Sequence, residues 1–71
     1  MNADQPSVAQ WMPIVRGEFQ EFPEMRLTRS QVQRLWSLDA LTCDALLSAL
    51  IDGQVLKRAP NGTYARADAG Y

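Results

Sequence analysis

The chain has 71 residues, 46% of them hydrophobic, and eight acidic side chains against seven Lys and Arg give a net charge of −1. This length suits one small domain, and the hydrophobic share is typical of globular proteins, so wholesale disorder is not expected. The charge provides no overall attraction to nucleic acid or to an acidic membrane, although a local cluster of cations could still do so.

The chain has no histidine and a single cysteine, Cys43. An internal disulfide and a Cys/His zinc site therefore cannot form. No nucleophile stands beside a base and no glycine-rich phosphate loop is present, so catalysis has no visible machinery. We expect a non-enzymatic protein without metal, cofactor or small-molecule substrate. Cys43 shares a helical face with Leu47 and Leu50, which favours a buried side chain over a reactive thiol.

Three parts of the chain are expected to behave differently. Residues 1–9 are polar and lack periodicity, which predicts a flexible lead-in, and residues 67–71 look like a frayed tail. The folded domain is expected over residues 10–66. The N-terminus has no basic stretch followed by an apolar one, and no window reaches the roughly 18 apolar residues of a membrane span. A cytoplasmic location is the expectation.

The first predicted helix depends on an apolar stripe with spacings of four, four and three: Trp11, Val15, Phe19 and Phe22. Pro13 is tolerated only in a first turn, so the helix is expected to begin between Gln10 and Met12. Pro23 is expected to end it. The aromatic residues could also serve as stacking platforms for single strands, but their helical spacing favours a core.

A second helix is predicted after a short extended piece, MRLT at residues 25–28. Thr28 has Gln31 three residues later, which is the spacing of a capping box. The segment SLD then interrupts the helix, and Asp39 is a suitable N-cap for the next one. The buried face of the second helix is predicted to consist of Val32, Leu35 and Trp36.

The third helix is predicted from about Ala40 to Asp52, and Gly53 is expected to end it in a left-handed conformation. A hairpin follows, in which Pro60 presets the turn and Asn61-Gly62 supplies positive φ angles between QVLKR and TYAR. One contiguous core is predicted, consisting of Val15, Phe19, Val32, Leu35, Trp36, Cys43, Leu47, Leu50, Leu56 and Tyr64.

The order of helix, short strand, helix, turn, helix and hairpin, together with LTRSQVQRLWSLD, TCDALLSALIDGQVLKR and NGTYAR, resembles the winged helix-turn-helix domain. It is also similar to short bacterial winged-helix proteins of undefined function. The resemblance implies a mainly α fold with a small β wing, made of three helices and a short antiparallel sheet. It further implies a transcription regulator, often a dimer, that lays its third helix in the major groove of double-stranded DNA and touches the backbone with its wing.

Cations cluster in two segments that can face the same side of a winged helix, and they are candidates for contacting DNA phosphates: Arg26, Arg29, Lys57, Arg58 and Arg66. The alternative interpretation is an ordinary solvated surface.

The outer side of the third helix offers different chemistry. It lacks the Arg, Lys, Asn and Gln side chains that bind base edges, and Asp44 and Asp52 would repel phosphates. A protein partner or a second copy could pack there instead, on Leu41, Ala45, Ser48 and Ala49. Two hypotheses stay open: weak DNA binding through the wing, or protein interaction without DNA. For the outer side of the third helix, the alternative to packing is a solvated helix rich in Ala and Ser.

Overall fold

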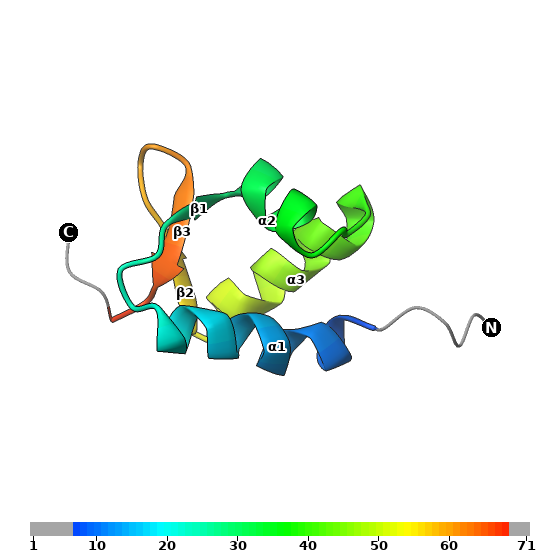
Figure 1. Cartoon of the computed structure of the whole chain (residues 1–71), viewed down its shortest axis with the longest axis horizontal. Coiled ribbons are helices and arrows are strands. Elements are labelled where there is room, and N and C mark those ends of the chain that lie inside the picture. The colour runs from blue at the N-terminus through cyan, green and yellow to red at the C-terminus, as the bar shows by residue number, and fades with distance from the viewer. Residues whose placement is uncertain (1–6, 69–71) are drawn as a thin grey trace.

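The computed structural model describes residues 7–68, which form three helices and a three-stranded antiparallel sheet. Figure 1 shows α1 along one side, α3 crossing above it, α2 opposite α1, and the sheet near the end of α1. The predicted fold class, mainly α with a small β wing, is confirmed, and the arrangement is compatible with a winged helix. The elements are α1 (Val8–Glu21), β1 (Leu27–Thr28), α2 (Arg29–Leu35), α3 (Ala40–Asp52), β2 (Leu56–Arg58) and β3 (Thr63–Arg66).

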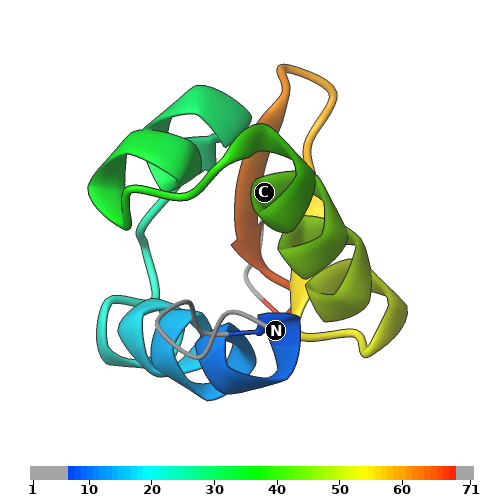
Figure 2. The same cartoon turned by 90° about the vertical axis from the view of Figure 1, so that its right-hand side faces the viewer.

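The sheet has β3 in the middle, between β1 and β2. Tyr64 on β3 lies opposite Leu27 of β1 and opposite Arg58 of β2. Because β1 leads directly into α2, this pairing ties the start of α2 to the hairpin. The end-on view in Figure 2 shows the three helices arranged around the middle of the molecule, with the sheet alongside. None of the helices within residues 7–68 is long and apolar enough to cross a membrane.

Helix α1 begins at Val8, earlier than the sequence predicted, so Pro13 lies inside the helix. The signal that was missed is a capping box: the Gln10 side chain accepts a hydrogen bond from the Ser7 N–H, and the Ser7 hydroxyl accepts one from the Gln10 N–H. This cap and the packing of Val8 against the core offset the cost of the helical hydrogen bond that is lost because Pro13 has no N–H. Val8 and Ala9 therefore belong to the fold, whereas residues 1–6 and 69–71 of the predicted lead-in and tail lie outside the described part.

Helix α3 has the predicted bounds, Ala40–Asp52, but the left-handed residue after it lies one position later than predicted. Gly53 has a φ of −82°, and the left-handed residue is Gln54, with a φ of 61°. The Val55 N–H then donates to the Leu50 carbonyl at 2.8 Å, which is the long hydrogen bond of a Schellman motif. The expectation that Gly53 is left-handed was wrong. Gly53 is the C-cap of α3, and the Schellman motif places its left-handed residue immediately after the C-cap, at Gln54.

The end of α2 uses the same motif. Ser37 has a φ of 53°, and the Leu38 N–H donates to the Gln33 carbonyl at 2.9 Å. This turn carries Leu38 into the core, where it is buried. Leu35, which the sequence placed in the core, is 56% exposed and that prediction was wrong, because the helix ends there and the turn delivers Leu38 instead.

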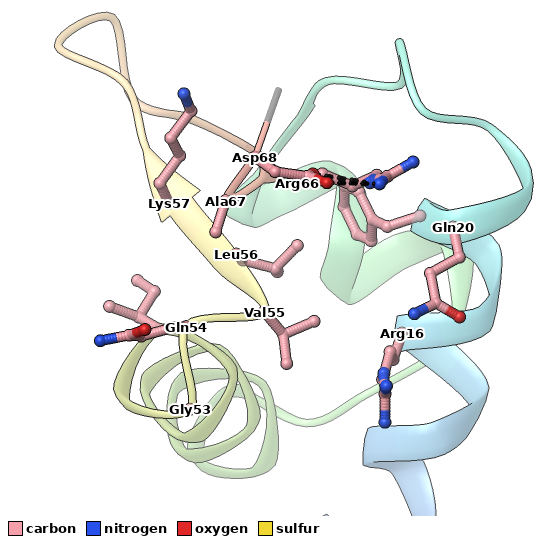
Figure 3. A pocket seen from close by; sticks show the side chains of 12 residues that line it. Arg16, Gln20, Gly53, Gln54, Val55, Leu56, Lys57, Arg66, Ala67 and Asp68 are labelled. Atoms are coloured by element: carbon pink, nitrogen blue, oxygen red, sulfur yellow. Dashed lines mark hydrogen bonds and ion pairs between the residues drawn. The ribbon is translucent and has the colours of Figure 1, made fainter. Parts of the chain in front are cut away.

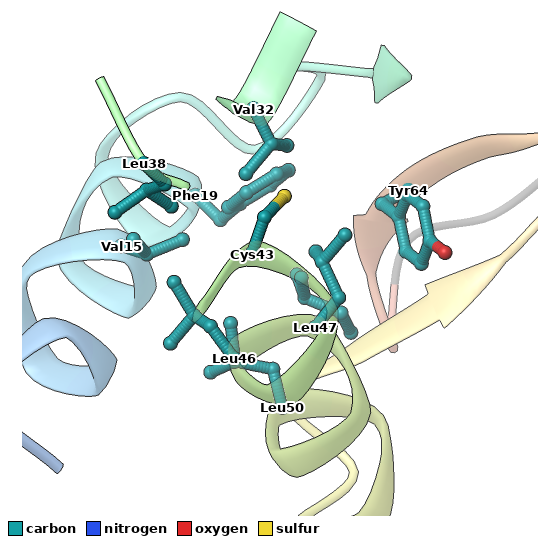
Figure 4. Packing of buried hydrophobic residues seen from close by; sticks show 10 residues of the cluster. Val15, Phe19, Val32, Leu38, Cys43, Leu46, Leu47, Leu50 and Tyr64 are labelled. Carbon is teal, nitrogen blue, oxygen red and sulfur yellow. The ribbon is translucent and has the colours of Figure 1, made fainter. Parts of the chain in front are cut away.

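Eight of the ten predicted core residues are buried, and Trp36 is half-buried against them. Phe22, whose helical spacing also favoured a core position, is 53% exposed, because α1 ends at Glu21. Figure 4 shows side chains from α1, α2, α3 and β3 meeting in one cluster. Leu38, Leu46 and Ala65 are buried as well and were not in the predicted set. The buried members that were predicted are Val15, Phe19, Val32, Cys43, Leu47, Leu50, Leu56 and Tyr64.

The hairpin turn contains one positive φ angle instead of two, at Gly62 with φ of 89°. The Gly62 N–H donates to the Ala59 carbonyl at 2.9 Å, and the Ala59 N–H donates to the Thr63 carbonyl at 2.8 Å. Asn61 does not adopt a positive φ; its side-chain oxygen instead accepts the Thr63 N–H at 3.2 Å. This is a three-residue loop with a left-handed glycine, which replaces the predicted Asn-Gly pair.

Candidate interaction surface of the third helix and the hairpin

One side of α3 is turned away from the core and is available for contacts. Leu41 is 82% exposed, Ala45 and Ser48 are exposed, and Ala49 is half-buried. We call these four residues the α3 outer face. Leu41, Ala45 and Ser48 are exposed, as the helical periodicity predicts, whereas Ala49 is only partly accessible.

Arg29, at the start of α2, forms an ion pair with Asp44 on α3. Its Nη1 also donates to the Gln33 Oε1 at 3.3 Å. The hydrogen bond from Arg29 and its positive charge hold the pKa of Asp44 below its ordinary value, and the same contact raises the pKa of Arg29. Arg29 was predicted as a phosphate contact, and in this structure its charge is balanced by the carboxylate that would repel phosphate.

A second ion pair holds Arg66 at the end of β3. Its Nε lies 2.9 Å from the Asp68 Oδ1, and its Nη2 lies 2.6 Å from Oδ2, so the contact is bidentate. The hydrogen bond from Arg66 lowers the pKa of Asp68, with help from the charges of Arg66 and Lys57. Asp68 was not among the predicted site residues, because residues 67–71 were expected to form a frayed tail. Its position two residues after Arg66 was the available signal, because that spacing brings side chains to the same side of an extended chain.

The sheet register divides the hairpin cations between two faces. Residues directly opposite each other in an antiparallel sheet share a face. Arg58 lies opposite the buried Tyr64, whereas Lys57 lies opposite Ala65 and so points to the other face. Arg66, opposite the buried Leu56, shares the face of Arg58. The remaining candidate, Arg26, is half-buried before β1.

Cys43 is enclosed between α2 and α3. It is fully buried, and its sulfur lies 3.8 Å from the Arg29 carbonyl oxygen. Burial raises the pKa of the Cys43 thiol, which keeps it in the unreactive neutral form. The predicted role as a small buried side chain is confirmed.

Comparisons of the chain with protein-family models, curated proteins and solved structures give no match. Among residues 7–68, no group of three or more His, Cys, Asp or Glu side chains could hold a metal ion. The α3 outer face offers small and apolar groups for packing, and the neighbouring Asp44 is balanced by Arg29. Arg58 is exposed, and it lies on the same face of the sheet as Tyr64, its partner in the register.

Proposed function

We propose that this chain is a small, non-enzymatic regulatory module of the winged-helix type whose α3 outer face packs against the same face of a second copy. The observation that carries the proposal is Leu41, a large apolar side chain that is 82% exposed at the start of α3. The small side chains of Ala45 and Ser48 allow another helix to approach closely, because the distance between packed helices depends on the side chains at the contact.

The ion pair between Arg29 and Asp44 supports self-association in particular. In a twofold dimer the same patch lies on both sides of the interface, so an unbalanced carboxylate would be brought towards its own copy. Arg29 balances Asp44 within each chain, which removes this repulsion. The same arrangement does not help the chain to recognise DNA bases, because the α3 outer face has no side chain that makes bidentate contacts with a base edge.

Light scattering coupled to size exclusion, over a range of protein concentrations, tests the proposal. We expect a dimer that dissociates on dilution, and a monomer for the variant Ala45→Arg/Ser48→Arg, because two cations from each copy would meet in the interface. Ala9→Arg, an exposed site on α1, is the matched control and should leave the dimer intact. All three proteins should have the same secondary structure by circular dichroism, since the altered side chains are exposed. A wild-type chain that is monomeric at every concentration, or a double variant that remains dimeric, would overturn the proposal.

Weak binding of double-stranded DNA through the wing is the second candidate, and Arg58 favours it. This side chain is exposed on β2 and forms no ion pair with any residue between 7 and 68. Fluorescence anisotropy with a random duplex at two salt concentrations tests the candidate, because phosphate contacts make affinity fall steeply with salt. Arg58→Glu should abolish the signal, and Arg34→Glu, an exposed cation on α2, should preserve it. The absence of salt-sensitive binding by the wild type would exclude this function.

A further inference from the structure

The loop between β2 and β3 contains the dipeptide Asn61-Gly62, which the proposed function does not use. Figure 2 shows this loop projecting beyond the sheet, on the side away from α1. Asn61 is exposed to solvent, and Gly62 is half-buried. Asparagine is among the thermally labile residues. One that precedes glycine is especially open to attack, because glycine has no Cβ to keep its backbone nitrogen away from the side-chain amide before it.

The reaction available to this pair is deamidation through a cyclic imide. The Gly62 backbone nitrogen, after losing its proton to hydroxide, forms a bond with the Asn61 Cγ. The Cγ–Nδ2 bond then breaks, and Nδ2 leaves as ammonia after taking a proton from water. Water next opens the ring: attack at Cγ leaves an ordinary aspartate, whereas attack at the main-chain carbonyl carbon leaves an isoaspartate, in which the chain runs through the former side chain. Overall, water is consumed and ammonia is released.

The turn engages both reacting groups. The Gly62 N–H donates to the Ala59 carbonyl oxygen at 2.9 Å, so the attacking nitrogen is committed to the turn. The Asn61 Oδ1 accepts the Thr63 N–H at 3.2 Å and the Thr63 hydroxyl at 2.8 Å, so the side-chain amide is held on the residue beyond the glycine. Cyclisation has to bring the Asn61 Cγ onto the Gly62 nitrogen, which requires these hydrogen bonds to open.

We propose that Asn61 is a site of spontaneous deamidation and that opening of the hairpin turn sets its rate. Only molecules whose turn is open react, so each hydrogen bond that holds the turn slows the reaction. Both products add a negative charge to the tip of the hairpin. An aspartate keeps the acceptor for the Thr63 donors, whereas an isoaspartate lengthens the main chain inside the turn and loosens it. The site goes beyond the proposed function, since it does not involve the α3 outer face.

Mass spectrometry of the full-length chain, incubated at mildly alkaline pH and then digested, tests the proposal. Deamidation is recognised by the mass gained when an amide becomes a carboxyl group. We expect Asn61 to react about tenfold faster or more in concentrated guanidinium chloride than in buffer, because the hydrogen bonds of the turn are lost. In the denaturant Asn61 should also react faster than Asn2, the other asparagine of the chain, because the Cβ of Ala3 hinders the attack there.

Thr63→Val tests the role of the turn in the folded chain. The variant removes the hydroxyl that donates to Asn61 and keeps the shape of the side chain, so Asn61 should react about three- to tenfold faster than in the wild type. Thr63→Ser is the matched control, because it retains the hydroxyl and should stay close to the wild-type rate. Circular dichroism verifies that both variants are folded, and the comparison of the wild type in buffer and in denaturant depends on neither of them.

Absence of the product at Asn61 in the denaturant, or a rate no higher than that of Asn2, would overturn the assignment of the site. Equal rates in buffer and in denaturant would overturn the control by the hairpin. A Thr63→Val variant that reacts no faster than the wild type would also overturn it. In particular, a slower reaction would mean that the hydroxyl activates the amide, by stabilising the negative oxygen that forms during the attack, instead of restraining it.

Discussion

Leu50 and Leu41 are the same residue type on the same helix, and their surroundings are opposite. Leu50 is fully buried in the cluster that α1, α3 and the sheet enclose, whereas Leu41 is the most exposed large hydrophobic residue between positions 7 and 68. Hydrophobicity alone therefore did not decide which leucine stabilises the fold. The position on the helical wheel did, because nine residues correspond to two and a half turns, which brings Leu50 to the opposite side of α3.

We expect Leu50→Ala to lower the free energy of unfolding by about 2–5 kcal/mol, because it removes buried methyl groups and leaves a cavity. Leu41→Ala, the matched control on the same helix, should change it by less than about 0.5 kcal/mol. Urea unfolding followed by tryptophan fluorescence measures both. Equal losses for the two variants would contradict the assignment of the inner face of α3.

At the scale of the elements, the turns that end α2 and α3 and the turn that closes the hairpin each contain one residue with a positive φ angle. Each helix ends on a left-handed residue that is not glycine, Ser37 or Gln54, whereas the hairpin places glycine at its left-handed position, Gly62. Gly53, next to Gln54, has an ordinary negative φ. The backbone therefore requires glycine at position 62 but not at position 53, so substitution by alanine should affect stability differently at the two positions.

Gly62→Ala should destabilise the chain by about 1–2 kcal/mol, because alanine resists the left-handed region even where space is free. No atom lies within 4 Å of the Cβ that this substitution would add, so the cost is conformational. Gly53→Ala should leave stability unchanged or raise it slightly, because the φ of Gly53 suits alanine. The new Cβ would lie 3.4 Å from the Ala49 carbonyl oxygen, which is a van der Waals contact without a clash. Thermal melts of both variants provide the measurement, and a larger loss at Gly53 would show that the turn is wrongly described.

At the scale of the whole molecule, carboxylates hold three separate junctions together. Asp39 caps α3, Asp44 joins α3 to α2 through Arg29, and Asp68 secures the end of β3 through Arg66. The Thr42 side chain and backbone N–H lower the pKa of Asp39 by hydrogen bonding to its carboxylate. All three carboxyl groups therefore have a pKa below the ordinary value of 3.8 in the folded chain.

Stability is expected to be constant from pH 7 to about pH 5 and to fall below about pH 4. A carboxyl group with a depressed folded pKa stabilises the fold above its unfolded pKa, and this contribution is lost as the pH falls through the folded pKa. Asp39→Asn should weaken the acid dependence, because asparagine retains a capping oxygen but cannot be protonated. Urea midpoints at pH 7, 5, 4 and 3 test this, and identical acid profiles for the variant and the wild type would exclude Asp39 as a contributor.

Local hydrogen bonds and periodicity were predictable from the sequence by itself. The capping box of Thr28 and Gln31 and the cap at Asp39 form as expected, because each connects residues three positions apart. Most of the core followed from helical spacing, since a regular helix turns a fixed angle per residue and must bury one side. The same logic placed Leu41 and Ala45 on the outer side of α3.

Only the tertiary structure decided which charges are balanced and where a groove opens. Arg29 and Asp44 are fifteen residues apart, and their contact depends on the angle at which α2 meets α3. A groove is lined by residues of both α1 and β2, among them Arg16 and Lys57, which no local pattern relates (Figure 3). Side chains distant in sequence meet only when packing fixes the relative positions of their elements, so periodicity, which describes one element at a time, contains no information about them.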